Sequence, residues 1–249
     1  MRKFLLAGAA LLLCSPSLAT DTVVFSGTAY KSKKKQSIAY NETHEVTEVS
    51  GRIVKSKTTY RNSQGDIIAV LSCDYGKNTY LPDFTFEDLR SGNWEKVVVT
   101  GDKVNIQYRD NRQAEIEELT MDIDKKLSGS QGLNQFIVSN LEKAVMGDRP
   151  VTTFILPARQ TTVDMILIGK KGEDGLAKVE LKLQNPFLRL FAPTLELVYD
   201  QKSQNLISYY GNSNIYTDTG DKQKVLIEYD YSQASRIAAK RIKNDQIPN

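Results

Sequence analysis

The sequence predicts a mainly β protein of the α+β class, built as a long curved antiparallel sheet, or half-barrel, with one central amphipathic helix packed on its concave face. Two observations lead to this fold class. Apolar and polar residues alternate along most of the chain, and turn-forming residues separate the alternating runs at short intervals. A single segment has helical spacing instead, so we expect one helix against the sheet.

The alternation is clearest near residue 105, where Val104, Ile106 and Tyr108 are separated by polar residues. Successive side chains of a strand point to opposite faces, so each such run buries one face and exposes the other, as in antiparallel sheets. Between runs, pairs such as Gly101-Asp102 provide the backbone conformations that hairpin turns need. The pattern predicts strands at 22–31, 36–49, 51–61, 66–75, 83–89, 94–100, 103–109, 114–122, 151–156, 161–169, 176–184, 194–200, 205–210 and 223–231.

The helical segment spans 130–146. Its apolar residues are Leu133, Phe136, Ile137, Leu141, Ala144 and Val145. Ser130 is a suitable N-cap, and Gly147 with Pro150 predicts the end of the helix. The apolar stripe either packs on the sheet as core or lines a ligand cavity at the mouth of the curved sheet.

A short apolar stretch lies between Pro186 and Pro193. It contains Phe187, Leu188, Leu190 and Phe191. Because soluble proteins rarely leave such a patch exposed, we expect it to plug the core, the alternative being a contact surface.

The chain divides into three parts. Residues 1–19 have the charged, apolar and small-residue regions of a cleavable signal peptide, with Arg2 and Lys3 before the apolar run and Ala19 at the cleavage position. The apolar run is too short to span a bilayer, and Leu13 before Cys14 argues against a lipoprotein. Residues 20–231 form the curved β domain, and 232–249 form a basic C-terminal tail. We therefore expect a periplasmic protein of a Gram-negative bacterium.

Composition excludes several classes of function. Loss of Arg2 and Lys3 reduces the 33 basic residues to 31 against 30 acidic ones, so the mature chain is nearly neutral and lacks the charge of a nucleic-acid binder. No later segment is long enough for a transmembrane helix. Cys73 is then the only cysteine, and we expect it to be buried or paired with a second chain.

The sequence offers little catalytic chemistry. His44 is the only histidine, and the polar run around it predicts an exposed strand face. Nucleophile-elbow, zinc-site and nucleotide-binding motifs do not occur, so we expect no metal, no cofactor and no enzymatic activity. Carboxylates remain as an alternative, in the groups Asp83, Glu87 and Asp88 and Glu115, Glu117 and Glu118. Two of them on one strand face have the spacing a glycosidase needs, as do many solvent-exposed acids.

Several stretches resemble a family of uncharacterised periplasmic proteins of Gram-negative bacteria. They are 60–65 (YRNSQG), 81–84 (LPDF) with Asp88 and Arg90, 154–159 (FILPAR), 195–200 (LELVYD) and 210–215 (YGNSNI). The layout of strands around a central helix is also similar to the lipoprotein-carrier half-barrel, whose cavity holds acyl chains. This resemblance implies a fold and a cellular location, and no catalytic residues.

These observations favour a non-enzymatic periplasmic binding protein that holds a lipid or an acylated envelope component in an apolar groove. The candidate ligand-binding residues are Leu133, Phe136, Ile137, Leu141, Phe187, Leu190 and Phe191. The alternatives are a structural module that scaffolds another envelope protein and a carboxylate-dependent hydrolase. The sequence leaves the oligomeric state open.

Overall fold

A computed structural model describes residues 20–124, 126–187, 189 and 194–238 of the 249-residue chain. Within them the chain forms one 15-stranded sheet with a single α-helix, which confirms the predicted fold class. The strands are β1 (Thr20–Tyr30), β2 (Ile38–Val49), β3 (Arg52–Arg61), β4 (Ile67–Asp74), β5 (Asp83–Asp88), β6 (Trp94–Thr100), β7 (Lys103–Arg109), β8 (Glu117–Asp122), β9 (Leu127–Ser128), β10 (Val151–Leu156), β11 (Thr161–Lys171), β12 (Leu176–Leu183), β13 (Leu195–Asp200), β14 (Leu206–Asn212) and β15 (Lys224–Ala238).

The strand order shows how the chain builds the sheet. It runs β8-β7-β6-β5-β4-β3-β2-β1-β15-β14-β13-β12-β11-β10-β9, and all neighbours are antiparallel except β9 and β10. The first and last strands therefore pair at the centre, while β8 and β9, neighbours in sequence, end the sheet on opposite sides. The sheet curls so far that the 3₁₀ turn η2 (Pro157–Arg159), after β10, lies against β7. The predicted alternation holds at the hairpin of β6 and β7, where Gly101 begins the two-residue turn with a φ of 62°.

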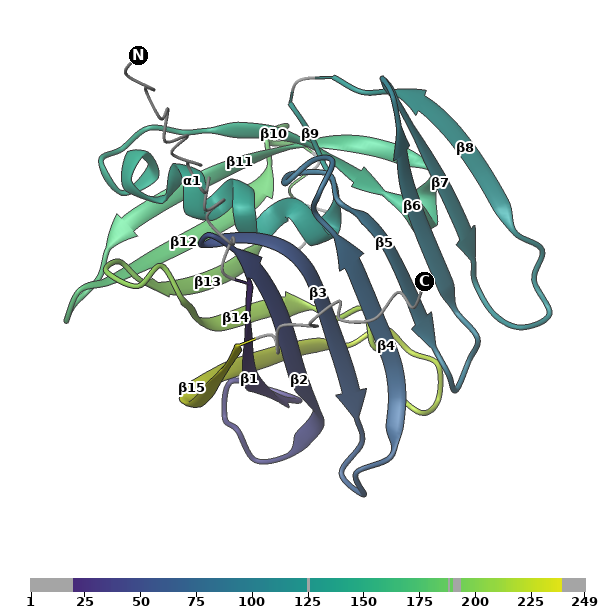
Figure 1. Ribbon diagram of the computed structural model, residues 1–249, viewed down its shortest axis with the longest axis horizontal. Coiled ribbons are helices and arrows are strands. Elements are labelled where there is room, and N and C mark those ends of the chain that lie inside the picture. Colours follow the sequence, from purple (N-terminus) through teal and green to yellow (C-terminus); the bar gives the residue numbers. More distant parts are fainter. Residues whose placement is uncertain (1–19, 125, 188, 190–193, 239–249) are drawn as a thin grey trace, which may run out of the picture.

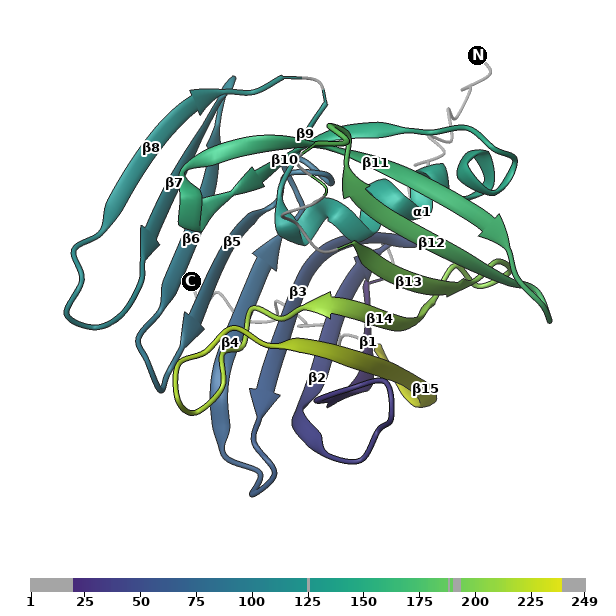
Figure 2. The same ribbon diagram turned by 180° about the vertical axis from the view of Figure 1, so that it is seen from behind.

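The helix α1 (Leu133–Val145) lies inside the curve, enclosed between the N-terminal strands and β10–β13 (Figures 1 and 2). Its buried residues Ile137, Leu141 and Ala144 pack against β11 and β12. Gly169 on β11 permits this approach, since a Cβ there would lie 2.8 Å from the helix backbone at Ala144. Gly132 precedes the helix and has no side chain to cap it, so the expected cap at Ser130 is wrong; Ser130 instead begins a 3₁₀ turn, η1 (Ser130–Gly132).

Two tyrosine hydroxyls hold the start of α1 to opposite flanks of the sheet. Tyr75, just after β4, donates to the carbonyl oxygen of Gln131 at 3.1 Å. Tyr199 on β13 donates to Asn134 Oδ1 at 2.8 Å. The helix is thereby fixed relative to both halves of the curved sheet.

The core consists of two hydrophobic clusters. The first lies under β2–β7 and includes Cys73, whose side chain is buried; burial raises the pKa of its thiol to about 11. The second lies between α1 and β11–β13. Tyr209 on β14 packs against both clusters and so connects the two parts of the core.

Two sequence expectations need correction, one for Phe187 and one for the C-terminal tail, whereas the signal peptide stays a prediction. Phe187 is 79% exposed, so it does not plug the core, and Leu190 and Phe191 lie outside the described residues. β15 continues through Ala238 by pairing with β1, so the predicted tail at 232–249 begins inside a strand; backbone pairing there overrides the side-chain pattern. The signal-peptide segment 1–19 also lies outside the described residues.

Candidate functional site

A cavity of about 880 Å³ lies between the concave face of the sheet and the helix. Strands β1–β4 and β13–β15 contribute most of its wall, and the segment 130–138 covers one side. Its size is within the roughly 300–1,000 Å³ typical of small-molecule sites. Polar side chains such as Glu42, His44 and Asn134 line it beside apolar ones such as Leu133 and Leu197, so this is an amphiphilic cavity rather than the purely apolar groove expected from the sequence.

Seven of the twelve tyrosines of the chain line this cavity. They are Tyr40, Tyr60, Tyr75, Tyr199, Tyr209, Tyr229 and Tyr231. A tyrosine supplies apolar area with a hydroxyl at its end, so a wall rich in tyrosine suits a ligand with both apolar and polar parts.

One polar network stands on the floor of the cavity. His44 on β2 contacts Glu42 Oε2 through Nε2 at 2.8 Å and Thr58 Oγ1 through Nδ1 at 3.0 Å. Strand geometry explains the grouping: Glu42 and His44 are two residues apart and share a face, and Thr58 is the cross-strand partner of His44 on β3. The expectation that His44 lies on an exposed face is therefore wrong.

Aromatic rings surround this network. The Phe25 ring stacks on His44 with centroids 4.7 Å apart and an interplanar angle of 6°, and Tyr231 stacks on Phe25 at 4.6 Å. Tyr229 meets His44 edge-on at 5.6 Å. A bulge of residues 231–234 opposite Phe25 brings Tyr231 and Ala234 to the cavity.

Gly27 makes room for Glu42 in this arrangement. It lies between Glu42 on β2 and Tyr229 on β15, and a Cβ there would be 3.1 Å from Glu42 Oε2 and 3.2 Å from the Tyr229 ring. The carboxylate and the ring therefore meet above the glycine. Burial raises the pKa values of the Tyr60 and Tyr229 hydroxyls well above 10, with a further contribution from the negative charge of Glu42, so both stay protonated donors at neutral pH.

The helix residues predicted from the sequence divide between site and core. Leu133 and Ile137 line the cavity. Phe136 packs edge-on against Tyr80 with centroids 6.5 Å apart, and Leu141 is buried in the second cluster. The structure thus brings two of the predicted residues to the cavity.

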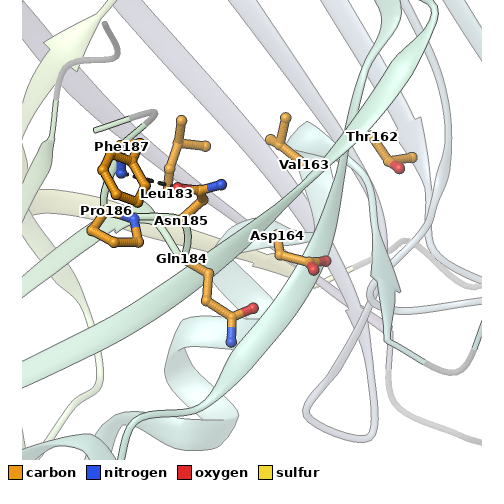
Figure 3. Close-up of a pocket in the computed structure, with 8 residues that line it drawn as sticks. All are labelled: Thr162, Val163, Asp164, Leu183, Gln184, Asn185, Pro186 and Phe187. Carbon is orange, nitrogen blue, oxygen red and sulfur yellow. Dashed lines mark hydrogen bonds between the residues drawn. The ribbon is translucent and has the colours of Figure 1, made fainter. Parts of the chain in front are cut away.

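Phe187 borders a separate pocket of about 560 Å³, formed by the start of β11 and the segment after β12 (Figure 3). Its backbone N–H donates to Asn185 Oδ1 at 2.9 Å. This pocket has no contact with the Glu42 network, because the lining residues of the two sites do not overlap.

The carboxylates considered for hydrolysis have structural partners or lie apart from the cavity. Asp83 accepts hydrogen bonds from the Val99 N–H at 2.7 Å and from Lys77 Nζ at 2.7 Å. Asp88 is buried and paired with Arg90 at 2.7 Å. Glu115 precedes β8, which begins at Glu117, so the expected strand face shared by these two acids does not form.

Metal-binding clusters and membrane-spanning helices are absent from the described residues. The described residues contain no group of three or more His, Cys, Asp and Glu side chains that could hold a metal ion. In the same part of the chain, no helix combines the length and apolar character needed to cross a bilayer.

Comparisons with known proteins give a structural similarity and no family. No protein-family model and no curated protein matches the chain. Among solved structures, the chain is similar to a "Beta-barrel-like Protein of Domain of Unknown Function DUF1849" from Brucella abortus. The identity is 9% and the TM-score 0.41, with 86% of this chain and 97% of that chain covered.

Proposed function

We propose that this chain is a non-enzymatic binding protein that holds a lipid or another acylated, amphiphilic molecule in the cavity between helix and sheet. The observation that carries the proposal is the 880 Å³ cavity, whose wall combines the apolar side chains of α1 with a floor of tyrosines and one buried polar network.

Burial of the acyl chain supplies the binding energy. Each methylene removed from water contributes about 0.8 kcal/mol. Leu133 and Ile137 on the helix and Leu197 on β13 provide the apolar wall. The polar floor on β1–β3 then orients the head of the ligand, since a buried polar atom without a partner would reduce affinity.

We further propose that the protein works in the periplasm. The charged, apolar and small-residue regions of residues 1–19 support export. The similarity of the layout to the lipoprotein-carrier half-barrel points to a ligand of the envelope, because acyl chains occupy the cavity of that family.

A cavity-filling substitution tests the proposal. Val46 lines the cavity, whereas Glu45, the next residue of β2, is exposed on the opposite face. Val46→Trp should reduce the affinity for a fluorescent fatty acid at least tenfold, and the matched control Glu45→Trp should leave it unchanged.

Lipid extraction followed by mass spectrometry of protein purified from its own periplasm provides the second measurement. We expect a bound acyl species in the wild type and less of it in Val46→Trp. Protein that is free of lipid and binds neither the fluorescent fatty acid nor an uncharged amphiphile such as dodecyl maltoside would refute the proposed function.

A further inference from the structure

The wall of the cavity has an unbalanced charge. Glu42 and Glu48 line it, and none of the described residues that line it is a lysine or an arginine. Among aromatic rings, a carboxylate without a cationic partner attracts positive charge strongly. The negative charge of the cavity wall therefore predicts a positively charged head group on the ligand.

Glu42 has one carboxylate oxygen engaged and one open. Its side chain is 5% exposed, and Oε2 contacts His44. Among the described residues no group hydrogen-bonds to Oε1. Among the described residues, Gln160 Nε2 is the one side-chain polar atom that is both fully buried and without a hydrogen-bond partner. Glu42 Oε1 also lacks a partner, so it must be accessible to solvent. Oε1 therefore opens on the cavity.

His44 does not have to neutralise this carboxylate. A neutral imidazole satisfies both contacts when it donates from Nε2 to Glu42 and accepts the Thr58 hydroxyl at Nδ1. In this state the negative charge of Glu42 has no counter-charge within the network. A ligand cation would supply it.

Aromatic rings complete the site. Tyr229 meets Glu42 above Gly27, and Tyr60 is the cross-strand partner of Glu42 on β3. Tyr40 lies edge-on to Tyr60 with centroids 5.9 Å apart. Faces of aromatic rings attract ammonium groups, and such rings around a carboxylate are suited to quaternary ammonium ions.

We propose that the open oxygen of Glu42 and the rings of Tyr229 and Tyr60 bind an ammonium group, carried as the head of the amphiphilic ligand. This inference rests on the proposed function, because the acyl chain occupies the remainder of the same cavity. A hard metal cation fits the site less well, since it requires several oxygen ligands, and Glu48, the other carboxylate that lines the cavity, lies six residues further along β2.

Head-group preference in the wild type is the first test and requires no variant. Dodecyltrimethylammonium, dodecanoate and dodecyl maltoside have the same alkyl chain and differ in head charge. Calorimetric titration of each below its micelle concentration should give at least about tenfold tighter binding of the cation, as expected of a desolvated cation–aromatic contact together with a carboxylate.

Glu42→Gln is the decisive variant. It preserves the shape of the side chain and removes its charge, so the preference for the cation should disappear while binding of dodecyl maltoside is retained. Glu45→Gln removes the same charge from the exposed face of the same strand and should leave the preference intact.

The outcomes separate the two proposals. Equal binding of all three amphiphiles by the wild type would overturn the ammonium site and leave the binding function standing. If tetramethylammonium bound as tightly as its dodecyl relative, the ammonium site would be supported and the acyl-binding function refuted. If Glu42→Gln retained the full preference for the cation, the assignment to Glu42 would be overturned.

Discussion

The two ends of one row of side chains on the inner face of the sheet differ in how the space above them is filled. The row crosses the strands through Val46, Ser56, Cys73, Phe84, Val97 and Ile106. At the β5–β7 end, Val97 and Ile106 are at most 1% exposed and belong to the first hydrophobic cluster. At the β2–β3 end, Val46 and Ser56 line the cavity.

The same pattern of strand pairing thus supports a filled core at the β5–β7 end of the row and an open cavity at the β2–β3 end. The strands are antiparallel neighbours throughout, so pairing alone does not distinguish the two ends. Side-chain volume and polarity make the difference: in this row β2 and β3 contribute Val46 and the small, polar Ser56, whereas β5–β7 contribute Phe84, Val97 and Ile106. Removing volume should therefore be costly at the filled end and inexpensive at the open end.

Truncating side chains at the two ends of this row should give the largest difference in the free energy of unfolding. Ile106→Ala leaves a cavity in a closed core and should lower the free energy of unfolding by about 4 kcal/mol. Val46→Ala at the open end should cost about 1 kcal/mol, since only the removed methyl groups lose contacts. Denaturant unfolding of both variants measures the difference. Equal losses would contradict the contrast between the two ends.

A second contrast concerns two glutamates on this face. Glu42 has His44 as a partner, whereas no described residue hydrogen-bonds to the side chain of Glu95, which lies between Phe86 and Tyr108 in the neighbouring row. Burial raises the pKa of Glu95 from its ordinary 4.5 to about 7. The unfolded chain therefore releases this proton first, and stability falls as the pH rises from about 4.5 to 7, then stays level.

Glu95→Gln should remove this loss, which amounts to at most about 3 kcal/mol. The measurement is the free energy of unfolding at pH values from 4.5 to 8 for the wild type and the variant. Glu87→Gln, an exposed glutamate on β5, is the matched control and should keep the wild-type pH profile. A Glu95→Gln profile parallel to that of the wild type would contradict the burial of this carboxyl.

The smallest expected effect comes from the hydroxyl that holds the helix. Tyr199→Phe removes the hydrogen bond to Asn134 and should cost about 1 kcal/mol. Tyr60→Phe removes a hydroxyl that no described residue hydrogen-bonds, so its stability should stay close to the wild type. Thermal unfolding compares the two, and hydrogen exchange of α1 should increase only in Tyr199→Phe. Equal exchange in both variants would rule out this anchor.

The sequence predicts the filled end much better than the open one. Val104, Ile106 and Tyr108 alternate with polar residues, so hydrophobic periodicity identifies both the strand and its buried face. Around His44 both faces of β2 carry polar residues, so hydrophobic periodicity does not indicate which face of this strand is buried. Only the three-dimensional pairing brings Glu42, His44 and Thr58 together in the cavity.

The helix illustrates the same limit. Its spacing predicts α1 and the stripe with Leu133 and Ile137, yet which apolar residues meet the sheet and which meet the cavity depends on the curvature of the sheet. The segment after β12 was predicted to be buried because it is apolar. Phe187 is exposed there, which local composition does not reveal.

The central pairing of β1 with β15 also determines when the molecule can be completed. Contacts such as Gly27 with Tyr229 join residues separated by almost the whole chain. The cavity floor therefore cannot form until the last strand has been synthesised and has paired with β1. Proteins rich in such distant contacts fold slowly. The pairing of β1 with β15 is the one strand pair in this sheet that does not join neighbours in sequence. A circular permutant with Thr20 linked to Ala238 and new ends between β8 and β9 would make every strand pair with a neighbour in sequence.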